Sequence, residues 1–321
     1  MVAEVSTADR YSRFAHFEAK GHSPLYQELA SGVAADAEML ALLDDSLPKP
    51  KRQPNLLLAA VRLCHGVAAD YGQFRGWVLD DPEPVLEIMR THSTQTNEPA
   101  RTAAMLPILS RIEGPVALVE VGASAGLCLY PDRFHYDFDG HQVGPESSPV
   151  RIRCAVEGPV PLPERLPEVV WRAGIDLNPL DVRNEDDVAW LRALIWPEET
   201  ERQERLSAAV EIARAEPPLL FTGDLLSTLD SVVARAPEDA TVVVFHTAVL
   251  NYLSPEGRES FYRKAMDLPV TWISQEAGGA FPEINAKVPE QRSDKALFVL
   301  AVSGEPIALT EPHGGWLRWF G

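Results

Sequence analysis

The chain has 321 residues, of which 45% are hydrophobic, enough for a real core in one large domain or two modest ones. Its formal net charge of −18 repels phosphate backbones, so we expect a small-molecule substrate and no nucleic-acid partner. The sequence has no apolar run of about 18 residues, no basic-then-apolar N-terminal segment and only three, scattered cysteines. We therefore expect a cytoplasmic protein without a membrane span, and its oligomeric state stays open.

Residues 1–113 have the pattern of an N-terminal helical region. Ser23 followed by Pro24 is a helix start, and apolar positions recur at helical spacing as far as Leu43. Two further helices are predicted at residues 55–63 and 84–90, and a third ends near Ile112. This stretch contains little of the alternation that predicts strands.

A dense polar cluster precedes the last of these helices; it consists of Gln95, Asn97, Glu98 and Arg101. Asn97, with Pro99 shortly after it, is a sound helix start. Two interpretations fit the cluster equally. The four side chains either cap the helix and face solvent, or the helix start folds over a cleft and they bind substrate.

From residue 114 to 321 the pattern changes to strands that alternate with helices, which predicts a mostly parallel sheet with right-handed crossovers. The expected strands are Ala117–Val121, Val169–Asp176, Pro218–Thr222, Thr241–His246 and Pro269–Ser274, and the expected helices are 187–196, 201–215, a helix after Asp224, and Gly257–Met266. Ala296–Val302 and Ile307–Leu309 predict a closing antiparallel hairpin. Arg133–Asp139 and Val150–Val156 predict a β-hairpin inserted at about 131–160.

The segment Ala117–Gly126 carries the strongest motif, a buried strand that ends in Glu120 and then a glycine-rich turn. An apolar, helix-compatible stretch follows at Leu127–Tyr130. Gly122 and Gly126 allow the backbone to approach a ligand closely, and Glu120 stands at the carboxyl edge of the sheet, where open α/β folds bind ligands. The spacing Gly122-x-Ser124-x-Gly126 also matches the nucleophile elbow of serine hydrolases. A purely structural turn is the third interpretation.

Three later strand ends carry polar residues. Asp176 ends the second strand and can accept hydrogen bonds from ribose hydroxyls, while Asp224 follows the third strand and either contacts an adenine amino group or caps a helix. His246 ends the fourth strand and is our candidate general base, with Tyr252 on the turn that follows. His246 can equally be a buried structural histidine. The sequence holds no Cys/His cluster with metal-ligand spacing, so no metal site is expected.

Four motifs in order resemble the bacterial family known as domain of unknown function 2332: Thr94–Glu98, Glu120–Leu127, Gly174–Asp181 and Trp190–Pro197. The resemblance extends from about Tyr11 to the C-terminus, and no activity is implied by it. The sheet region is more distantly similar to the Rossmann-like, class I methyltransferases that use S-adenosylmethionine. That likeness implies that Glu120, Gly122 and Gly126 bind the methionine side of this cofactor, Asp176 its ribose and Asp224 its adenine. We expect Ser124 to be a turn residue that donates hydrogen bonds near the cofactor. Ser124 replaces a glycine frequent in this motif, and the gap from Glu120 to Asp176 is longer than usual.

Three functions follow from these patterns. The first is methyl transfer from S-adenosylmethionine to a small molecule, with His246 as base. The second is ester or amide hydrolysis with Ser124 as nucleophile, Asp224 as acid and His246 or His313 as base. The third is a non-catalytic module that binds a nucleoside-like ligand or a protein. The helical region before the turn and the acids after later strands favour the first.

Overall fold

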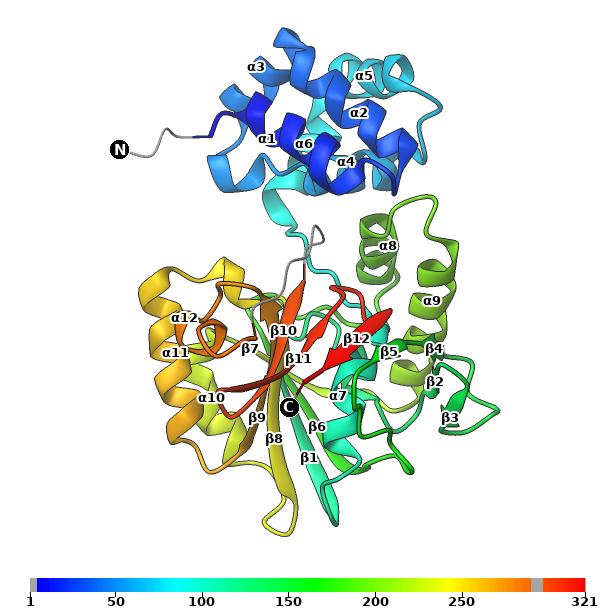
Figure 1. Ribbon diagram of the computed structural model, residues 1–321. Helices are drawn as coiled ribbons and strands as arrows, with labels where there is room; N and C mark the ends of the chain where they lie inside the picture. Colours follow the sequence, from blue (N-terminus) through cyan, green and yellow to red (C-terminus); the bar gives the residue numbers. More distant parts are fainter. Residues whose placement is uncertain (1–4, 290–296, 321) are drawn as a thin grey trace. The chain divides into compact units, whose positions relative to one another are not determined.

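The computed structural model describes residues 5–289 and 297–320 (Figure 1). The chain forms two compact units. A helical unit comprises Met1–Thr96 and Asn184–Gln203, and a sheet unit comprises Asn97–Arg183 and Glu204–Gly321. None of the helices in the described ranges is both long and apolar enough to cross a membrane.

The helical unit is built from short helices whose ends match the sequence signals. They are α1 (Thr7–Arg13), the π-helix η1 (Phe14–Ala19), α2 (Pro24–Ala35), α3 (Ala37–Ser46), η2 (Lys49–Lys51), α4 (Pro54–His65), α5 (Tyr71–Asp80), α6 (Pro82–Thr91) and α8 (Glu185–Leu194). Ser23 caps α2 by accepting a hydrogen bond from the Tyr26 N–H at 3.0 Å. Leu56–Val61 of α4 are all buried and form the centre of this unit. Residues 184–203, which carry α8, group with the N-terminal helices.

The sheet unit contains a large, mostly parallel sheet, so the α/β class predicted from the sequence is confirmed. Its strand order is β5-β12-β11-β10-β9-β8-β1-β6-β7. The parallel strands are β1 (Pro115–Val121), β6 (Glu168–Asp176), β7 (Leu219–Thr222), β8 (Thr241–Thr247) and β9 (Thr271–Ala277). The helices and turns between them are η3 (Pro99–Arg101), α7 (Thr102–Leu109), η4 (Leu127–Leu129), α9 (Thr200–Ala215), α10 (Leu225–Val233), η5 (Leu250–Tyr252), α11 (Pro255–Asp267) and α12 (Pro282–Asn285). Helix α9 begins in residues grouped with the helical unit and continues in the sheet unit.

The closing hairpin expected near the C-terminus is present. It consists of β10 (Phe298–Val302) and β11 (Glu305–Thr310), which pair antiparallel, and β10 also pairs antiparallel with β9. Ala296, the first residue of the expected strand, lies outside the described residues. A further strand, β12 (Trp316–Trp319), pairs with β11, and β5 (Ala155–Glu157) completes this side of the sheet.

The inserted segment differs from the single hairpin that the sequence predicts. Its hairpin is formed by β2 (His135–Phe138) and β3 (His141–Val143), because Asp139 and Gly140 both adopt positive φ and so make a two-residue turn. The second expected arm, Val150–Val156, is divided between two sheets. Its first part, β4 (Arg151–Arg153), pairs parallel with β2 in a separate three-stranded sheet, and its second part is β5.

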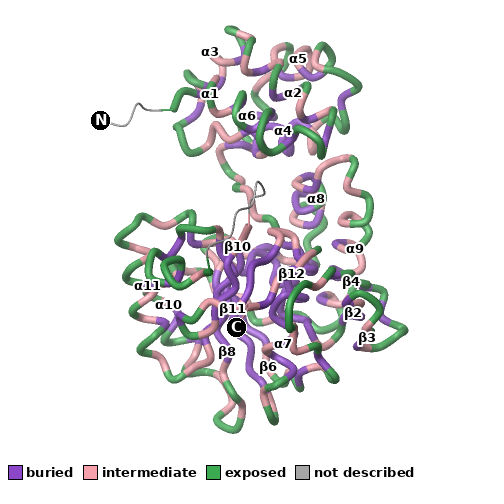
Figure 2. The backbone as a smooth tube through the Cα atoms, viewed as in Figure 1, coloured by how far each residue is buried: buried purple, intermediate pink, exposed green. Residues whose placement is uncertain are grey.

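The two faces of the large sheet at β1 have different surroundings. Val119 and Val121 belong to a hydrophobic core with residues of α10 and α11, among them Leu229 and Phe261. Since successive side chains of a strand point to opposite faces, Leu118 and Glu120 lie on the other face. Figure 2 shows that the central strands are the most buried part of this unit. We refer below to the face of Val121 as the aromatic face and to the face of Glu120 as the glycine-loop face.

Candidate functional site

The strand order changes direction at β1, because the strands that follow it in the chain lie first on one side of it and then on the other. The second and third parallel strands, β6 and β7, extend from one edge of β1, and β8 and β9 extend from the other. In open α/β sheets, ligands bind outside the carboxyl ends of the strands at such a switch point. The residues after β1, β6 and β8 are therefore the first place to look for a site.

The loop after β1 is tightly built. Gly122 and Gly126 have φ of 73° and 72°, and a Cβ on Gly122 would lie 2.2 Å from Cγ2 of Val249, so only glycine fits there. Ser124 also has a left-handed φ, 52°, as does Ala248 just after β8. Strained backbone at two neighbouring strand ends is a feature that clusters at functional sites.

Most backbone N–H groups of this loop are already bonded inside the protein. The Gly122 and Ala123 N–H groups donate to the Ile175 carbonyl, and the Ser124 N–H donates to Asp176 Oδ2 at 2.8 Å. The Leu127 N–H donates to Asn97 Oδ1, also at 2.8 Å. The helix-compatible stretch at Leu127–Tyr130 forms only the three-residue 3₁₀ helix η4. The loop therefore offers a ligand few N–H donors, unlike a phosphate-binding turn that opens a long helix.

Glu120 is the most unusual titratable group at this edge. Its side chain is 1% exposed, and Oε2 has no hydrogen-bond partner among the described residues. Burial raises the pKa of this carboxyl well above its usual value, while the positive charge of Arg101 opposes the shift. Burial likewise raises the pKa of the neighbouring Cys128 thiol, which donates a hydrogen bond to the Glu98 carbonyl. A buried oxygen without a partner is costly, so it marks a place where a ligand group or a water can bind.

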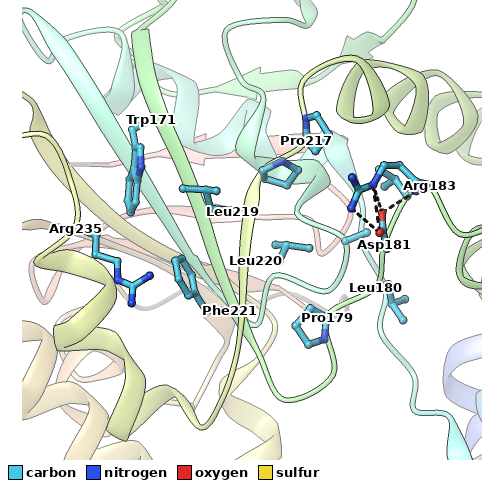
Figure 3. A pocket seen from close by; sticks show the side chains of 13 residues that line it. Trp171, Pro179, Leu180, Asp181, Arg183, Pro217, Leu219, Leu220, Phe221 and Arg235 are labelled. Atoms are coloured by element: carbon cyan, nitrogen blue, oxygen red, sulfur yellow. Dashed lines mark hydrogen bonds and ion pairs between the residues drawn. The ribbon is translucent and has the colours of Figure 1, made fainter.

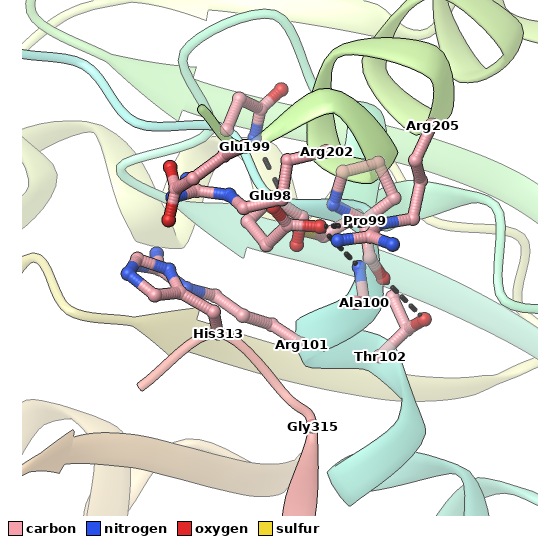
Figure 4. Close-up of polar contacts among 12 residues, drawn as sticks. Glu98, Pro99, Ala100, Arg101, Thr102, Glu199, Arg202, Arg205, His313 and Gly315 are labelled. Carbon is pink, nitrogen blue, oxygen red and sulfur yellow. Dashed lines mark hydrogen bonds and ion pairs between the residues drawn. The ribbon is translucent and has the colours of Figure 1, made fainter. Parts of the chain in front are cut away.

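The polar cluster before α7 is divided between the two units. Gln95 belongs to the helical unit, whereas Asn97, Glu98 and Arg101 belong to the sheet unit, where all three are buried. Arg101 donates to the carbonyls of Pro312 (2.9 Å) and Thr247 (3.3 Å), and Figure 4 shows it beside the loop that carries His313. Glu98 accepts a hydrogen bond from Arg205 at 2.7 Å. These three side chains are thus parts of the carboxyl edge and not a solvated helix start.

The two aspartates predicted to bind the cofactor have different surroundings. Asp176 accepts the Ser124 N–H on Oδ2 and the Asn178 N–H on Oδ1 at 2.9 Å, so it joins the loops after β1 and β6. Beside it, the Leu177 side chain is 75% exposed. Asp224 is exposed and accepts the N–H groups of Leu226 and Ser227, at 2.9 and 3.2 Å. Asp224 is thus the N-cap of α10, the alternative that the sequence left open.

His246 lies on the aromatic face and is fully buried. Its Nδ1 lies 2.7 Å from Oε1 of Glu276, which also accepts the N–H groups of Val249 (2.9 Å) and Leu250 (3.2 Å). The ring is surrounded by the rings of Phe261, Trp272 and Phe281. Its Nε2 is buried without a hydrogen-bond partner among the described residues. The candidate base therefore faces a packed aromatic cluster, whereas Tyr252 on η5 is exposed.

Sequence reasoning missed Glu276, because the fifth strand was expected to end at Ser274. The strand in fact continues to Ala277, and Ser274, Gln275 and Glu276 are all buried. Three polar residues directly after the apolar Trp272 and Ile273 were the only local signal for this. Polar residues at this point are equally typical of a strand that has ended and of a strand that continues with buried polar side chains, so the sequence did not distinguish the two.

The serine-hydrolase arrangement is not assembled as the sequence suggested. Ser124 is 3% exposed, its proposed acid Asp224 caps α10, and the carboxylate that pairs with His246 is Glu276. His313 lies in the loop between β11 and β12, where its N–H donates to Glu311. In the described ranges, no group of three or more His, Cys, Asp or Glu side chains has an arrangement that could hold a metal ion.

Comparison with known proteins gives one match. The model of a family described as "Uncharacterized protein conserved in bacteria (DUF2332)" matches residues 8–319. No curated protein matches the chain, and no solved structure does.

Proposed function

We propose that this chain, which belongs to the uncharacterised bacterial family DUF2332, binds a small nucleoside-type ligand at the carboxyl edge of its sheet, with S-adenosylmethionine as the first candidate. The observation that carries the proposal is the buried Oε2 of Glu120, which has no partner among the described residues and lies at the switch point of the strand order. A site at this position fits the class of open α/β folds whose ligands contain ribose.

The groups around this point are mainly acceptors, so they suit the donor-bearing parts of a ligand. Each carboxylate oxygen accepts more than one hydrogen bond, so Asp176 can bind ribose hydroxyls while it keeps the Ser124 and Asn178 N–H groups. Oε2 of Glu120 can accept a hydrogen bond from a ligand hydroxyl or amino group, and the exposed Leu177 offers apolar surface to a base. The carboxylate of the methionine portion fits less well at the loop after β1, where most of the N–H groups are bonded.

S-adenosylmethionine, when bound, supplies a methyl group on a positively charged sulfur. In such a reaction the chain's residues have to hold and orient the cofactor and to exclude water. Glu120 and Asp176 are our candidates for holding it. His246 is directed away from this face, so the proposed function does not assign it a proton.

Isothermal titration of the purified protein with S-adenosylmethionine tests the proposal. We expect binding that Asp176→Asn and Glu120→Gln each weaken by about tenfold or more. Asp230→Asn is the matched control, because Asp230 is an exposed carboxylate on α10 that pairs with Lys264 away from the β1 loop. Absence of heat at millimolar ligand with folded protein, or equal affinity of the three variants, contradicts the proposal.

Serine hydrolysis remains a second candidate because of one observation, the left-handed backbone of Ser124 in a turn that follows a strand. A fluorophosphonate probe reports a reactive serine directly. Labelling of the wild-type protein that disappears in Ser124→Ala, and persists in Ser227→Ala, would favour the hydrolase. Absence of labelling removes this candidate.

A further inference from the structure

Strand β7 stands at one end of the large sheet, so within the described residues only one of its edges is paired. The Gly223 N–H donates to the Asp176 carbonyl at 2.9 Å, on the β6 side. Because backbone groups of successive residues in a strand point to opposite edges, the N–H and C=O groups of Leu220 and Thr222 are directed to the free edge. The free edge therefore carries backbone hydrogen-bonding groups in the register of a strand.

A groove of about 560 Å³ follows this edge (Figure 3). On one side of β7 the groove is lined by Leu219, Phe221 and Trp171 of β6, and on the other side by Leu220 and Pro179. Leu219 is 51% exposed, so its apolar side chain is accessible at this edge. The groove thus offers apolar surface on both faces of a strand whose outer edge is free.

Each side of the groove also carries a guanidinium group. Arg235 lies over the Phe221 ring at 4.9 Å, and it forms no ion pair among the described residues. On the other side Arg183 pairs with Asp181 at 2.8 Å, and its side chain is largely exposed. Two arginines and one aspartate therefore line this groove, in a protein whose net charge is −18. The local charge is opposite in sign to that of the whole chain.

We propose that the free edge of β7 binds an extended, acidic peptide segment of a partner protein as an added strand. In this mode backbone hydrogen bonds supply affinity, and pockets for alternate side chains supply specificity. The peptide's backbone pairs with Leu220 and Thr222. Its alternate side chains enter the two sides of the groove, where an acidic side chain meets Arg235 on one side or Arg183 on the other.

The charges disfavour a second copy of this chain as the occupant. A second copy offers this edge the same two arginines and an Asp181 that already pairs with its own Arg183, so it brings no additional carboxylate for them. Pro217 and Pro218, which lack N–H donors, also limit the strand to Leu219–Thr222 and so discourage long edge-to-edge association. A small apolar ligand uses one face of the strand and leaves the second arginine without a role.

Selection of random peptides displayed on phage, with the full-length protein as bait, tests the proposal. We expect wild-type protein to enrich acidic sequences of high β-propensity. A synthetic consensus peptide should then bind in fluorescence polarisation, and the double variant Arg183→Glu/Arg235→Glu should weaken this binding by about tenfold or more. The control is Arg263→Glu at an exposed arginine of α11, to be compared with the single variants Arg183→Glu and Arg235→Glu, each of which makes the same change of charge.

Two further measurements make the result decisive. N-methylation of alternate backbone amides of the consensus peptide should abolish binding, since an added strand needs those donors. The proposal is overturned by absence of enrichment, by neutral or basic peptides that bind the double variant as well as wild type, or by N-methylated peptides that retain affinity. Dimerisation of the wild-type chain that the double variant loses, measured by light scattering, would assign the edge to a second copy instead.

Discussion

The two faces of the sheet at its carboxyl edge each bury a glutamate, and the two glutamates have very different partners. Glu276 on the aromatic face gathers His246 and the N–H groups of Val249 and Leu250 on a single oxygen. Glu120 on the glycine-loop face leaves Oε2 without a partner, and burial raises its pKa. Oε2 of Glu276 is likewise buried without a partner among the described residues, so the two carboxylates differ in what Oε1 of Glu276 holds, a histidine ring and the backbone of a turn. We interpret Glu276 as structural and Glu120 as available to a ligand.

The largest expected effect comes from removing the carboxylate on the aromatic face. Glu276→Ala leaves the His246 ring and two backbone N–H groups buried without their acceptor, so we expect a loss of about 3–5 kcal/mol in the free energy of unfolding. Urea denaturation followed by circular dichroism measures it. The matched control is Glu305→Ala, because Glu305 is exposed and its ion pair with Lys287 contributes at most about 1 kcal/mol.

A loss of less than about 1 kcal/mol in Glu276→Ala would contradict the structural role. Ligand titration separates the two faces further. If Glu276 only holds the turn, the folded fraction of a milder variant, Glu276→Gln, keeps near wild-type affinity for S-adenosylmethionine. Glu120→Gln should behave in the opposite way, with folding retained and affinity lost.

The second largest effect tests the contact between Val249, in the turn after β8, and Gly122, in the loop after β1. In Gly122→Ala the new Cβ meets Val249 at 2.2 Å and the residue keeps a φ of 73°, so overpacking and backbone strain add to about 2–4 kcal/mol. Gly114→Ala is the control, since Gly114 has a φ of 75° with open space around its Cβ position, and only the strain of about 1–2 kcal/mol is expected. Equal losses in the two variants would mean that Val249 moves aside without cost.

The strands whose own residues carry a clear apolar pattern were predicted well. Hydrophobic alternation placed β1, β6, β7 and β8 within a few residues, because a buried strand needs apolar side chains along its own length. The two aspartates show where such reasoning stops. Asp176 is the last residue of β6, and Asp224 comes two residues after β7. Leu225 starts a helix directly after Asp224 and makes it a cap, whereas Leu177 and Asn178 delay any helix after Asp176.

The partners of the site residues depend on contacts that are distant in sequence. Glu276 lies 30 residues from His246, and no local signal tells that the two strands bring them together on one face. The same holds for Arg101, whose acceptors at Thr247 and Pro312 come from two distant loops. The roles of Glu120 and Asp176 toward a ligand stay predictions, since they depend on a molecule that the chain itself does not specify.

The last expected effect, which is the smallest when taken per unit of pH, concerns the protonation of Glu120 and tests whether burial keeps this carboxyl protonated. Its pKa is raised in the folded protein, so the native state holds a proton that the unfolded chain releases once the pH exceeds about 4.5. The folded state must therefore lose stability relative to the unfolded state as the pH rises from that value toward the pKa of the buried group. Glutamine has nearly the shape of the protonated side chain and does not titrate.

We therefore expect the free energy of unfolding of Glu120→Gln, minus that of wild type, to increase with pH between 5 and 8, by at most about 1.4 kcal/mol per pH unit. Urea denaturation at several pH values measures this difference, with the exposed Glu305→Gln as the control that should stay flat. A flat difference for Glu120→Gln would mean that Arg101 keeps the carboxylate ionised in the folded state. The free acceptor would then carry a full negative charge, and a cationic group would be favoured at Oε2 over a hydroxyl.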